Sequence, residues 1–472
     1  MRFSSLPPSS LLAALFLASS AIATPLPEVP ERFPHAILAR APVPPQEDPF
    51  YAKPSDDQFA RRPAGAIIRQ RSATPGQFTI LPQNLASAEQ VIYKTIDLQG
   101  NPEVNALTVF MPKKTDLNAD GLPKTLVYQV AEDSPNSNCA PSIQLQKGGS
   151  GNLVIQLESI FINAALAKNW IVVVPDYQGP RSGFTAGKLA GTGVLDAARA
   201  TLRVSSIVEP SRAGRLPLAL MGYSGGALAS GWALQQQKEY APELSSNLVA
   251  AALGGLPVNV EDILLKLNGG PMAGLVVSGL AGQYNVRPEL QEFFTDHLNA
   301  DGFSRLREAN GTCLPQIILA NGGVDFVSKL DMTQEELLRE PVVRKTLDES
   351  FLGVGAGVLP IPVYAYHATN DDVVGTEFAD KYYADQISRG ATITYDREIV
   401  SEHLLAFVTG FGSAIQYLEA RFAGVAAPPS STQTRLLNLL QPTAIAQLGP
   451  TVLAQIQALL GIPSGSLFSS NA

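Results

Sequence analysis

Short runs of aliphatic, β-branched and aromatic residues recur along the chain, and each has the length of a single strand. The run WIVVVP at 170–175 is nearly continuous, which is typical of a strand buried on both faces of a parallel sheet. Similar runs lie at 125–130, 216–222 and 248–255 and begin at Ile361 and Ala391. These runs predict the strands of one buried sheet.

Segments with helical patterns separate the predicted strands. They cover residues 158–169, 191–206, 225–240 and 375–390. Strands that alternate with helices over about 280 residues predict an α/β fold with a doubly wound, mostly parallel sheet. In such folds the ligand binds at the carboxyl ends of the strands.

One long segment breaks this alternation. From about 257 to 359 the pattern is mostly helical, and it includes a stretch of apolar and small residues at 269–284. Such an insertion is too long for a loop. We therefore expect a helical cap within a main domain that spans residues 48–425.

The two ends of the chain have different patterns. Arg2, an apolar run at 11–18 and the triplet Ala-Ile-Ala at 21–23 predict a signal peptide over residues 1–23 and hence a secreted, extracellular protein. The proline-rich residues 24–47 predict a propeptide or an extended arm. Residues 426–472 predict a linker followed by an amphipathic tail that packs on the surface.

Composition narrows the function. The net charge is −8, and no run of Lys and Arg occurs, so we expect no nucleic-acid partner. Cys139 and Cys313 are the only cysteines, and in an oxidising compartment they predict one disulfide, with two buried thiols as the alternative. The sequon at Asn310 predicts glycosylation of a surface loop.

The segment 222–226, GYSGG, matches the G-x-S-x-G pattern of a nucleophile elbow. The pattern is short, but a predicted strand precedes Ser224 and a predicted helix follows it directly, as an elbow requires. Gly222, Gly225 and Gly226 would let strand and helix approach closely. We therefore predict that Ser224 is a catalytic nucleophile.

A serine nucleophile needs a base, and the chain offers four histidines, His35, His297, His367 and His403. The order nucleophile, acid, histidine selects His403, because it alone follows an acid at a strand end. Asp371 is preferred as that acid over Asp372, for which capping of the next helix is expected. His367 is expected to be a satisfied histidine at a strand end.

Several further sequence motifs support the assignment of the serine, the acid and the histidine. They lie at 48–51, 132–142, 175–187, 222–227, 267–275, 313–316, 367–374 and 401–404. Through them the chain resembles the fungal secretory lipases from residue 48 to about 424. It lacks the second, C-terminal cysteine pair of that family, and its sequence after Phe422 does not match the family's C-terminal flap.

The resemblance implies an α/β-hydrolase with a helical cap and a triad of Ser224, Asp371 and His403. It also implies an oxyanion hole made by the N–H of Gly225 and by Asp133, and pairing of the two cysteines between the oxyanion-side loop and the cap. An aspartate can serve there only if its N–H points inward or its carboxyl group is protonated. Otherwise it is an ordinary turn residue.

The function expected from these observations is that of a secreted serine lipase acting on long-chain acylglycerols through an acyl-enzyme. Apolar side chains of the cap segment would line an acyl tunnel or simply pack: Met272, Leu275, Val276, Val277 and Leu280. The alternatives are a narrower carboxylesterase, deacetylase or acyltransferase for a soluble metabolite, and a catalytically silent binding protein. We expect no cofactor and no metal, a monomer, and transient contact with a lipid interface.

Overall fold

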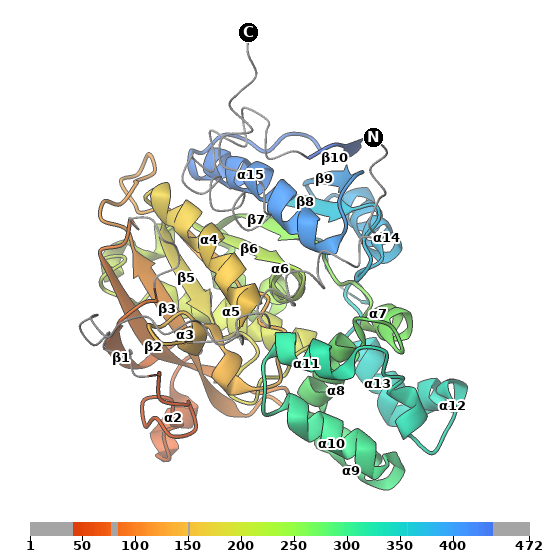
Figure 1. Ribbon diagram of the computed structural model, residues 1–472. Coiled ribbons are helices and arrows are strands. Elements are labelled where there is room, and N and C mark those ends of the chain that lie inside the picture. Colours follow the sequence, from red (N-terminus) through yellow and green to blue (C-terminus); the bar gives the residue numbers. More distant parts are fainter. Residues whose placement is uncertain (1–40, 77–83, 150–151, 356, 438–472) are drawn as a thin grey trace, which may run out of the picture. The chain divides into compact units, whose positions relative to one another are not determined.

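The computed structural model describes residues 41–437, apart from 77–83, 150–151 and 356 (Figure 1). The predicted signal peptide, most of the proline-rich arm and the predicted C-terminal tail lie outside the described residues. No helix within the described ranges is long and apolar enough to cross a membrane.

The centre of the molecule is a ten-stranded sheet of order β1-β2-β3-β5-β4-β6-β7-β8-β9-β10. Strands β4 to β10 run parallel to one another. Each predicted run forms one of them: β4 Thr125–Gln129, β5 Ile171–Pro175, β6 Leu218–Tyr223, β7 Leu248–Gly254, β8 Val363–Ala368 and β9 Ile393–Glu398. Because their carboxyl ends share one edge, the loops that follow them converge there.

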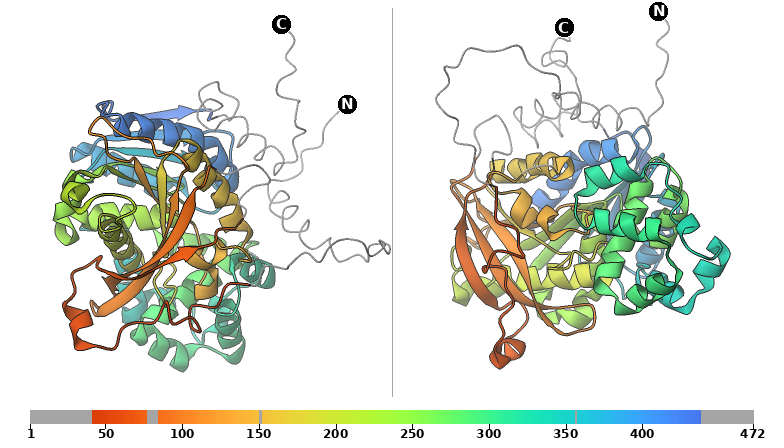
Figure 2. Two further views of the ribbon diagram at one scale, coloured as in Figure 1. Left: turned by 90° about the vertical axis from the view of Figure 1, so that its left-hand side faces the viewer. Right: turned by 60° about the horizontal axis from the view of Figure 1, so that its bottom comes forward.

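The amino-terminal part of the sheet is antiparallel and was not predicted. It consists of β1 Ile67–Ala73, β2 Ser87–Ile96 and β3 Pro102–Met111, and Figure 2 shows these strands in orange. Their apolar runs are interrupted by buried polar residues such as Gln90, whose Nε2 donates to the main-chain oxygen of Ser142 at 2.5 Å. Such partners come from distant segments, so the local pattern does not reveal that these positions are buried.

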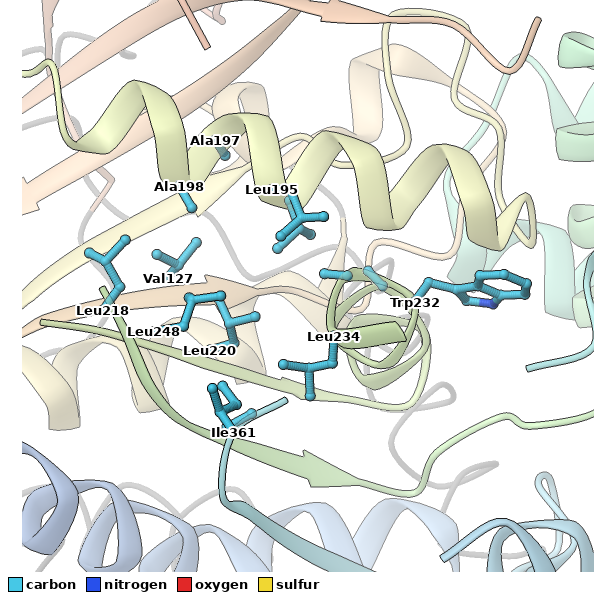
Figure 3. Packing of buried hydrophobic residues seen from close by; sticks show 14 of the residues in the cluster. Val127, Leu195, Ala197, Ala198, Leu218, Leu220, Trp232, Leu234, Leu248 and Ile361 are labelled. Atoms are coloured by element: carbon cyan, nitrogen blue, oxygen red, sulfur yellow. The ribbon is translucent and has the colours of Figure 1, made fainter. Parts of the chain in front are cut away.

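Helices cover both faces of the sheet. On one face α5 Gly187–Thr201, α6 Gly225–Tyr240 and α14 Thr376–Ser388 pack against alternate strand residues. Figure 3 shows this core, with Leu195 of α5 and Leu234 of α6 near Val127 and Leu220 of the sheet. On the other face lie α4 Leu153–Ala167 and α15 His403–Phe422. The architecture is that of a doubly wound α/β-hydrolase.

Strand β10, Ser431–Arg435, lies within the stretch predicted as a linker. It pairs parallel with β9, and most of its residues are exposed. Backbone pairing with an open sheet edge forms this strand, together with an ion pair between Arg435 and the buried Asp396. Neither cause leaves a hydrophobic pattern in the sequence.

The segment between β7 and β8 is helical. Its helices are α7 Val260–Leu267, α8 Ala273–Val286, α9 Pro288–His297, α10 Ala300–Ala309, α11 Leu314–Asn321, α12 Gln334–Arg339 and α13 Pro341–Glu349. They share a core of their own, in which Val277, Phe294 and Phe326 are buried. Figure 1 shows these helices, coloured green to teal, gathered into one group. We call this group the cap.

The remaining helical elements of the described chain are short. They are α2 Asp57–Arg61, α3 Pro141–Gln144, η2 Ser137–Cys139, η3 Pro210–Arg215, η4 Pro242–Ser246 and η5 Val327–Lys329. A disulfide between Cys139 and Cys313, with Cα atoms 5.6 Å apart, joins η2 to the start of α11. The predicted disulfide is thus confirmed, and it ties the cap to the loop after β4.

Candidate active site

Ser224 occupies a strained turn between β6 and α6. Its backbone has φ 51° and ψ −120°, a conformation that L-residues other than glycine rarely adopt. The helix then starts at once with Gly225, and a side chain at Gly226 would overlap the main-chain oxygen of Gln129 on β4. Because Gly225 and Gly226 have no side chains, α6 packs close to the sheet, and Ser224 lies in the turn at the carboxyl end of β6.

His403 reaches Ser224 from the first residue of α15. Its Nε2 lies 2.9 Å from Ser224 Oγ, and its Nδ1 lies 2.7 Å from Asp371 Oδ2. The hydroxyl of Tyr223 donates to the main-chain oxygen of His403 at 2.5 Å, and the two rings lie 5.2 Å apart. The sequence-predicted serine, histidine and aspartate thus form one continuous hydrogen-bonded chain.

Asp371 is buried in the loop after β8. Its Oδ1 accepts hydrogen bonds from the N–H groups of Val373 and Val374 at 3.0 and 2.6 Å, which leaves Oδ2 for His403. The neighbouring Asp372 does not cap the next helix as expected. Helix α14 starts only at Thr376, and Asp372 Oδ1 instead accepts from the N–H of His403 at 3.3 Å.

The ionisation of this pair follows from its geometry. Burial alone would raise the pKa of Asp371, but the charge of His403 and hydrogen bonds from His367 and His403 outweigh burial and hold that pKa well below its usual range. Burial alone would lower the pKa of His403, but the charge of Asp371 and the hydrogen bond to it raise that pKa above its ordinary value. Asp371 is therefore a carboxylate, which suits it to stabilise an imidazolium.

A second histidine lies against the same carboxylate. His367 is fully buried at the end of β8, where its Nε2 hydrogen-bonds to the main-chain oxygen of Val374 at 3.0 Å and lies 3.2 Å from Asp371 Oδ2. The sequence predicted a satisfied histidine and missed this contact with Asp371. The sequence carried no signal for it, because a spacing of four residues brings side chains together on a helix, whereas His367 ends strand β8 and Asp371 lies in the loop after it.

Asp133 approaches the same place from the loop after β4. Its φ is 48°, and its side chain sits so close to Gly225 that a Cβ there would overlap Asp133 Oδ1. Ser278 Oγ on α8 donates to its main-chain oxygen at 2.6 Å. The amide of Gln178, oriented to satisfy its own hydrogen bonds, accepts from the main-chain N–H of Asp133 at 3.1 Å.

The main-chain N–H and oxygen of Asp133 are both hydrogen-bonded, whereas one oxygen of its side chain is not, within the described residues. The carboxyl group is buried, and its Oδ1 has no hydrogen-bond partner among the described residues. Burial raises the pKa of Asp133 to about 7, although the charge of His403 acts to lower it. This carboxyl group is therefore protonated at mildly acidic pH and can then donate a hydrogen bond.

An apolar pocket lies within the cap. Of the side chains predicted to contact substrate, Leu275, Val276 and Leu280 line it, whereas Met272 packs against the cap core. Val277 is buried in that core as well. Gly279, which directly follows Ser278 on α8, also lines the pocket, whereas none of Ser224, Asp371 and His403 is among the lining residues.

The predicted glycosylation site lies at the end of α10. Asn310 is the residue after this helix, and its Oδ1 accepts a hydrogen bond from Asn285 at 2.8 Å. Glycosylation there stays a prediction. Within the described ranges, no group of at least three His, Cys, Asp or Glu side chains is placed to hold a metal ion.

A parallel sheet flanked by helices, with a strained serine, an acid and a histidine in order after β6, β8 and β9, defines an α/β-hydrolase. Comparison with known proteins then places the chain more narrowly. It belongs to the family described as secretory lipase, whose profile matches residues 145–429. It is accordingly a carboxylic-ester hydrolase of the lipase type.

Individual relatives agree with this family. The chain is 34% identical to lipase A of Arthroderma benhamiae over 92% of both chains, and 34% identical to lipase 5 of Candida albicans over 81% of this chain and 82% of that one. It resembles the crystal structure of Candida antarctica lipase A with a TM-score of 0.79 and 29% identity, covering 90% of this chain and 98% of that one.

A more distant relative limits what membership of the family implies. The chain is 30% identical to a Mycobacterium tuberculosis protein named a probable inactive lipase, over 91% of this chain and 94% of that one. Activity therefore has to be argued from the residues of each chain. In this one, serine, histidine and aspartate are all present and in contact.

Proposed function

We propose that this protein is a secreted serine lipase that hydrolyses long-chain acylglycerols through an acyl-enzyme. The observation that carries the proposal is the hydrogen-bonded chain from Asp371 through His403 to Ser224. It supplies a nucleophile, a base whose Nε2 lies 2.9 Å from the nucleophilic oxygen, and a carboxylate that holds the imidazole.

In the first half-reaction Ser224 Oγ attacks the ester carbonyl carbon while its proton passes to His403 Nε2. The carbon–oxygen bond to the alcohol then breaks, and Nε2 returns the proton to the departing oxygen. Water repeats these steps on the acyl-enzyme, releasing the fatty acid and restoring Ser224. Throughout, Asp371 stabilises the imidazolium and keeps the Nδ1 proton in place.

The oxyanion is stabilised by the N–H of Gly225 and by the protonated carboxyl group of Asp133. Gly225 is the first residue of α6, where N–H groups lack partners within the helix. The main-chain N–H and oxygen of Asp133 are both engaged, so its side chain supplies the donor. One such donor contributes roughly 3 kcal/mol to the stability of the transition state.

The acyl chain of the substrate enters the pocket of the cap. Leu275, Val276 and Leu280 offer it an apolar wall, and burial of each CH₂ group contributes about 0.8 kcal/mol. The relatives named lipases support a lipid ester as the substrate. We further propose that the mature chain is an extracellular monomer, glycosylated at Asn310, that touches the lipid interface transiently.

Hydrolysis of an ester series from acetyl to oleoyl, together with emulsified triolein, tests this function. The wild type should prefer long chains, and Ser224→Ala should lose about 10⁶-fold in kcat. Leu280→Trp narrows the pocket and should reduce kcat/KM for oleoyl but not acetyl esters. Leu319→Trp is the matched control, because Leu319 is 59% exposed on the cap and does not line the pocket.

Two results would contradict the proposal. Activity confined to acetyl esters would indicate the narrower esterase or deacetylase. Equal rates for the wild type and Ser224→Ala would mean that Ser224 is not the nucleophile, and the silent binding protein would become the better explanation.

A further inference from the structure

The proposed mechanism does not use His367, a buried second histidine at the site. Its Nε2 lies 3.2 Å from Asp371 Oδ2, the oxygen that also lies 2.7 Å from His403 Nδ1. Two imidazole rings therefore share a single carboxylate oxygen. Only one of them, His403, reaches the serine.

The surroundings of His367 fix where its proton lies. Its Nε2 faces the main-chain oxygen of Val374 at 3.0 Å and the Asp371 carboxylate, and both of these groups only accept hydrogen bonds. Its Nδ1 is buried and has no partner in the part of the chain that the structure describes. A neutral ring with its hydrogen on Nε2 leaves no buried donor unpaired.

The same contacts constrain the loop that carries the acid. Asp371 Oδ1 accepts from the N–H groups of Val373 and Val374, and His367 donates to the oxygen of Val374. Val374 is thereby held at both its N–H and its C=O. With Oδ1 fixed by the loop, the carboxylate can present only Oδ2 to His403.

We propose that His367 is a positioning residue, which fixes the rotation of the Asp371 carboxylate and, by sharing its Oδ2, makes His403 less basic than Asp371 alone would. This inference rests on the proposed roles of Asp371 and His403. The N–H dipole of His367 stabilises negative charge on Oδ2, so less of that charge is available to stabilise the His403 imidazolium. A less basic His403 stays neutral, and thus competent as a base, to lower pH.

Other titratable or charged groups also lie near His403 and Asp371. The carboxylates of Asp372 and Glu402 raise the pKa of His403, the charge of His403 acts on Asp133, and the Tyr223 ring lies 5.2 Å from the His403 ring. Lys266 Nζ on α7 donates to the main-chain oxygen of Asp371 at 2.8 Å. All of them remain when His367 alone is replaced, so a change in the pH profile reports on His367.

The test is the pH dependence of kcat and KM with a soluble ester, for the wild type, His367→Gln, His367→Asn and His367→Leu. Glutamine places an N–H₂ group where Nε2 lies, whereas asparagine is too short and leucine has no donor. We expect His367→Asn and His367→Leu to move the acid limb of kcat/KM to higher pH by about half a unit or more. At low pH this shift lowers kcat/KM about threefold. Glutamine should leave the limb in place.

Tyr364→Phe is the matched control for stability. Tyr364 also lies on β8, and its hydroxyl donates to the buried carboxylate of Asp396 at 2.6 Å, away from the triad. Its loss should lower the melting temperature without moving the pH profile. His367→Leu should change both.

Three outcomes would overturn the inference: an unmoved acid limb in both His367→Asn and His367→Leu, a limb moved equally by His367→Gln, or a limb moved by Tyr364→Phe. Failure of the proposed function would look different. In that case the wild type and Ser224→Ala would have equal rates at every pH.

Discussion

The two sides of the active site are built in opposite ways. On the base side, His403 is hydrogen-bonded to both Ser224 and Asp371 before any substrate arrives. On the oxyanion side, both side-chain oxygens of Glu132 and one of Asp133 are buried without a partner among the described residues. Ser224 on the base side and Asp133 on the oxyanion side have a similarly strained backbone, with φ 51° and 48°.

The difference shows how a partner decides the effect of burial on a carboxyl group. Burial raises the pKa of Asp133 to about 7 and that of Glu132 well above its usual value, so both favour the neutral form. Asp371 is buried too, but two histidines outweigh that burial and keep it ionised. One side therefore carries a charge that holds a base. The other carries an acid with no partner among the described residues for its Oδ1, and we propose that the oxyanion of the transition state takes that place.

Among variants that keep Ser224, the largest expected effect comes from breaking the base side. Asp371→Asn keeps the size of the side chain but removes its charge, so it no longer stabilises the imidazolium or the correct tautomer of His403. We expect kcat to fall about 10⁴-fold. Steady-state kinetics measure this, and an unchanged near-ultraviolet circular dichroism spectrum shows that the fold survives. A loss below tenfold would assign the acid to another residue.

The next effect comes from the oxyanion side. Asp133→Ala removes the donor and should reduce kcat by about 10² to 10³-fold with little change in KM. For the wild type, activity should decline as pH rises through about 7, because Asp133 loses its proton there. Asp133→Asn donates at every pH, so it should retain activity and lack this decline. A decline that persists in Asp133→Asn would contradict the assignment.

A smaller effect tests how the cap holds the oxyanion side. Ser278→Ala deletes the hydrogen bond from α8 to the main-chain oxygen of Asp133. If Asp133 is positioned less well, the activation free energy rises by about 1 kcal/mol, and kcat decreases about fivefold. Thr201→Val is the control, because it removes another buried hydroxyl, hydrogen-bonded to Ala197 on α5, away from the site. Equal effects of the two variants would mean that Ser278 acts only through stability.

Much of the fold was predictable because its parallel strands are buried on both faces and so read as apolar runs. The antiparallel strands β1 to β3 were missed, since partners such as Ser142 for Gln90 make their polar residues compatible with burial. Strand β10 was missed because backbone pairing with β9, rather than apolar side chains, holds it. In the cap, three of the five predicted tunnel residues line the pocket, whereas Met272 and Val277 do not.

The site was predictable where chain order constrains it. The G-x-S-x-G turn and the order of acid and histidine selected Ser224, Asp371 and His403, which the structure brings together. The sequence revealed neither the contact of His367 with Asp371 nor the lack of a partner for Asp133 Oδ1 among the described residues. Both depend on which side chains surround a buried carboxyl group after folding.

The sequence by itself determined the strand and helix alternation, the candidate triad, and the family to which the chain belongs, because these follow from local patterns and their order. Only the tertiary structure decided the ionisation of the buried acids. The pKa of a carboxyl group depends on its exclusion from water and on the charges within a few ångströms. Residues from the loops after β4 and β8, from β8 itself, and from α8 and α15 meet at that distance only in the folded chain.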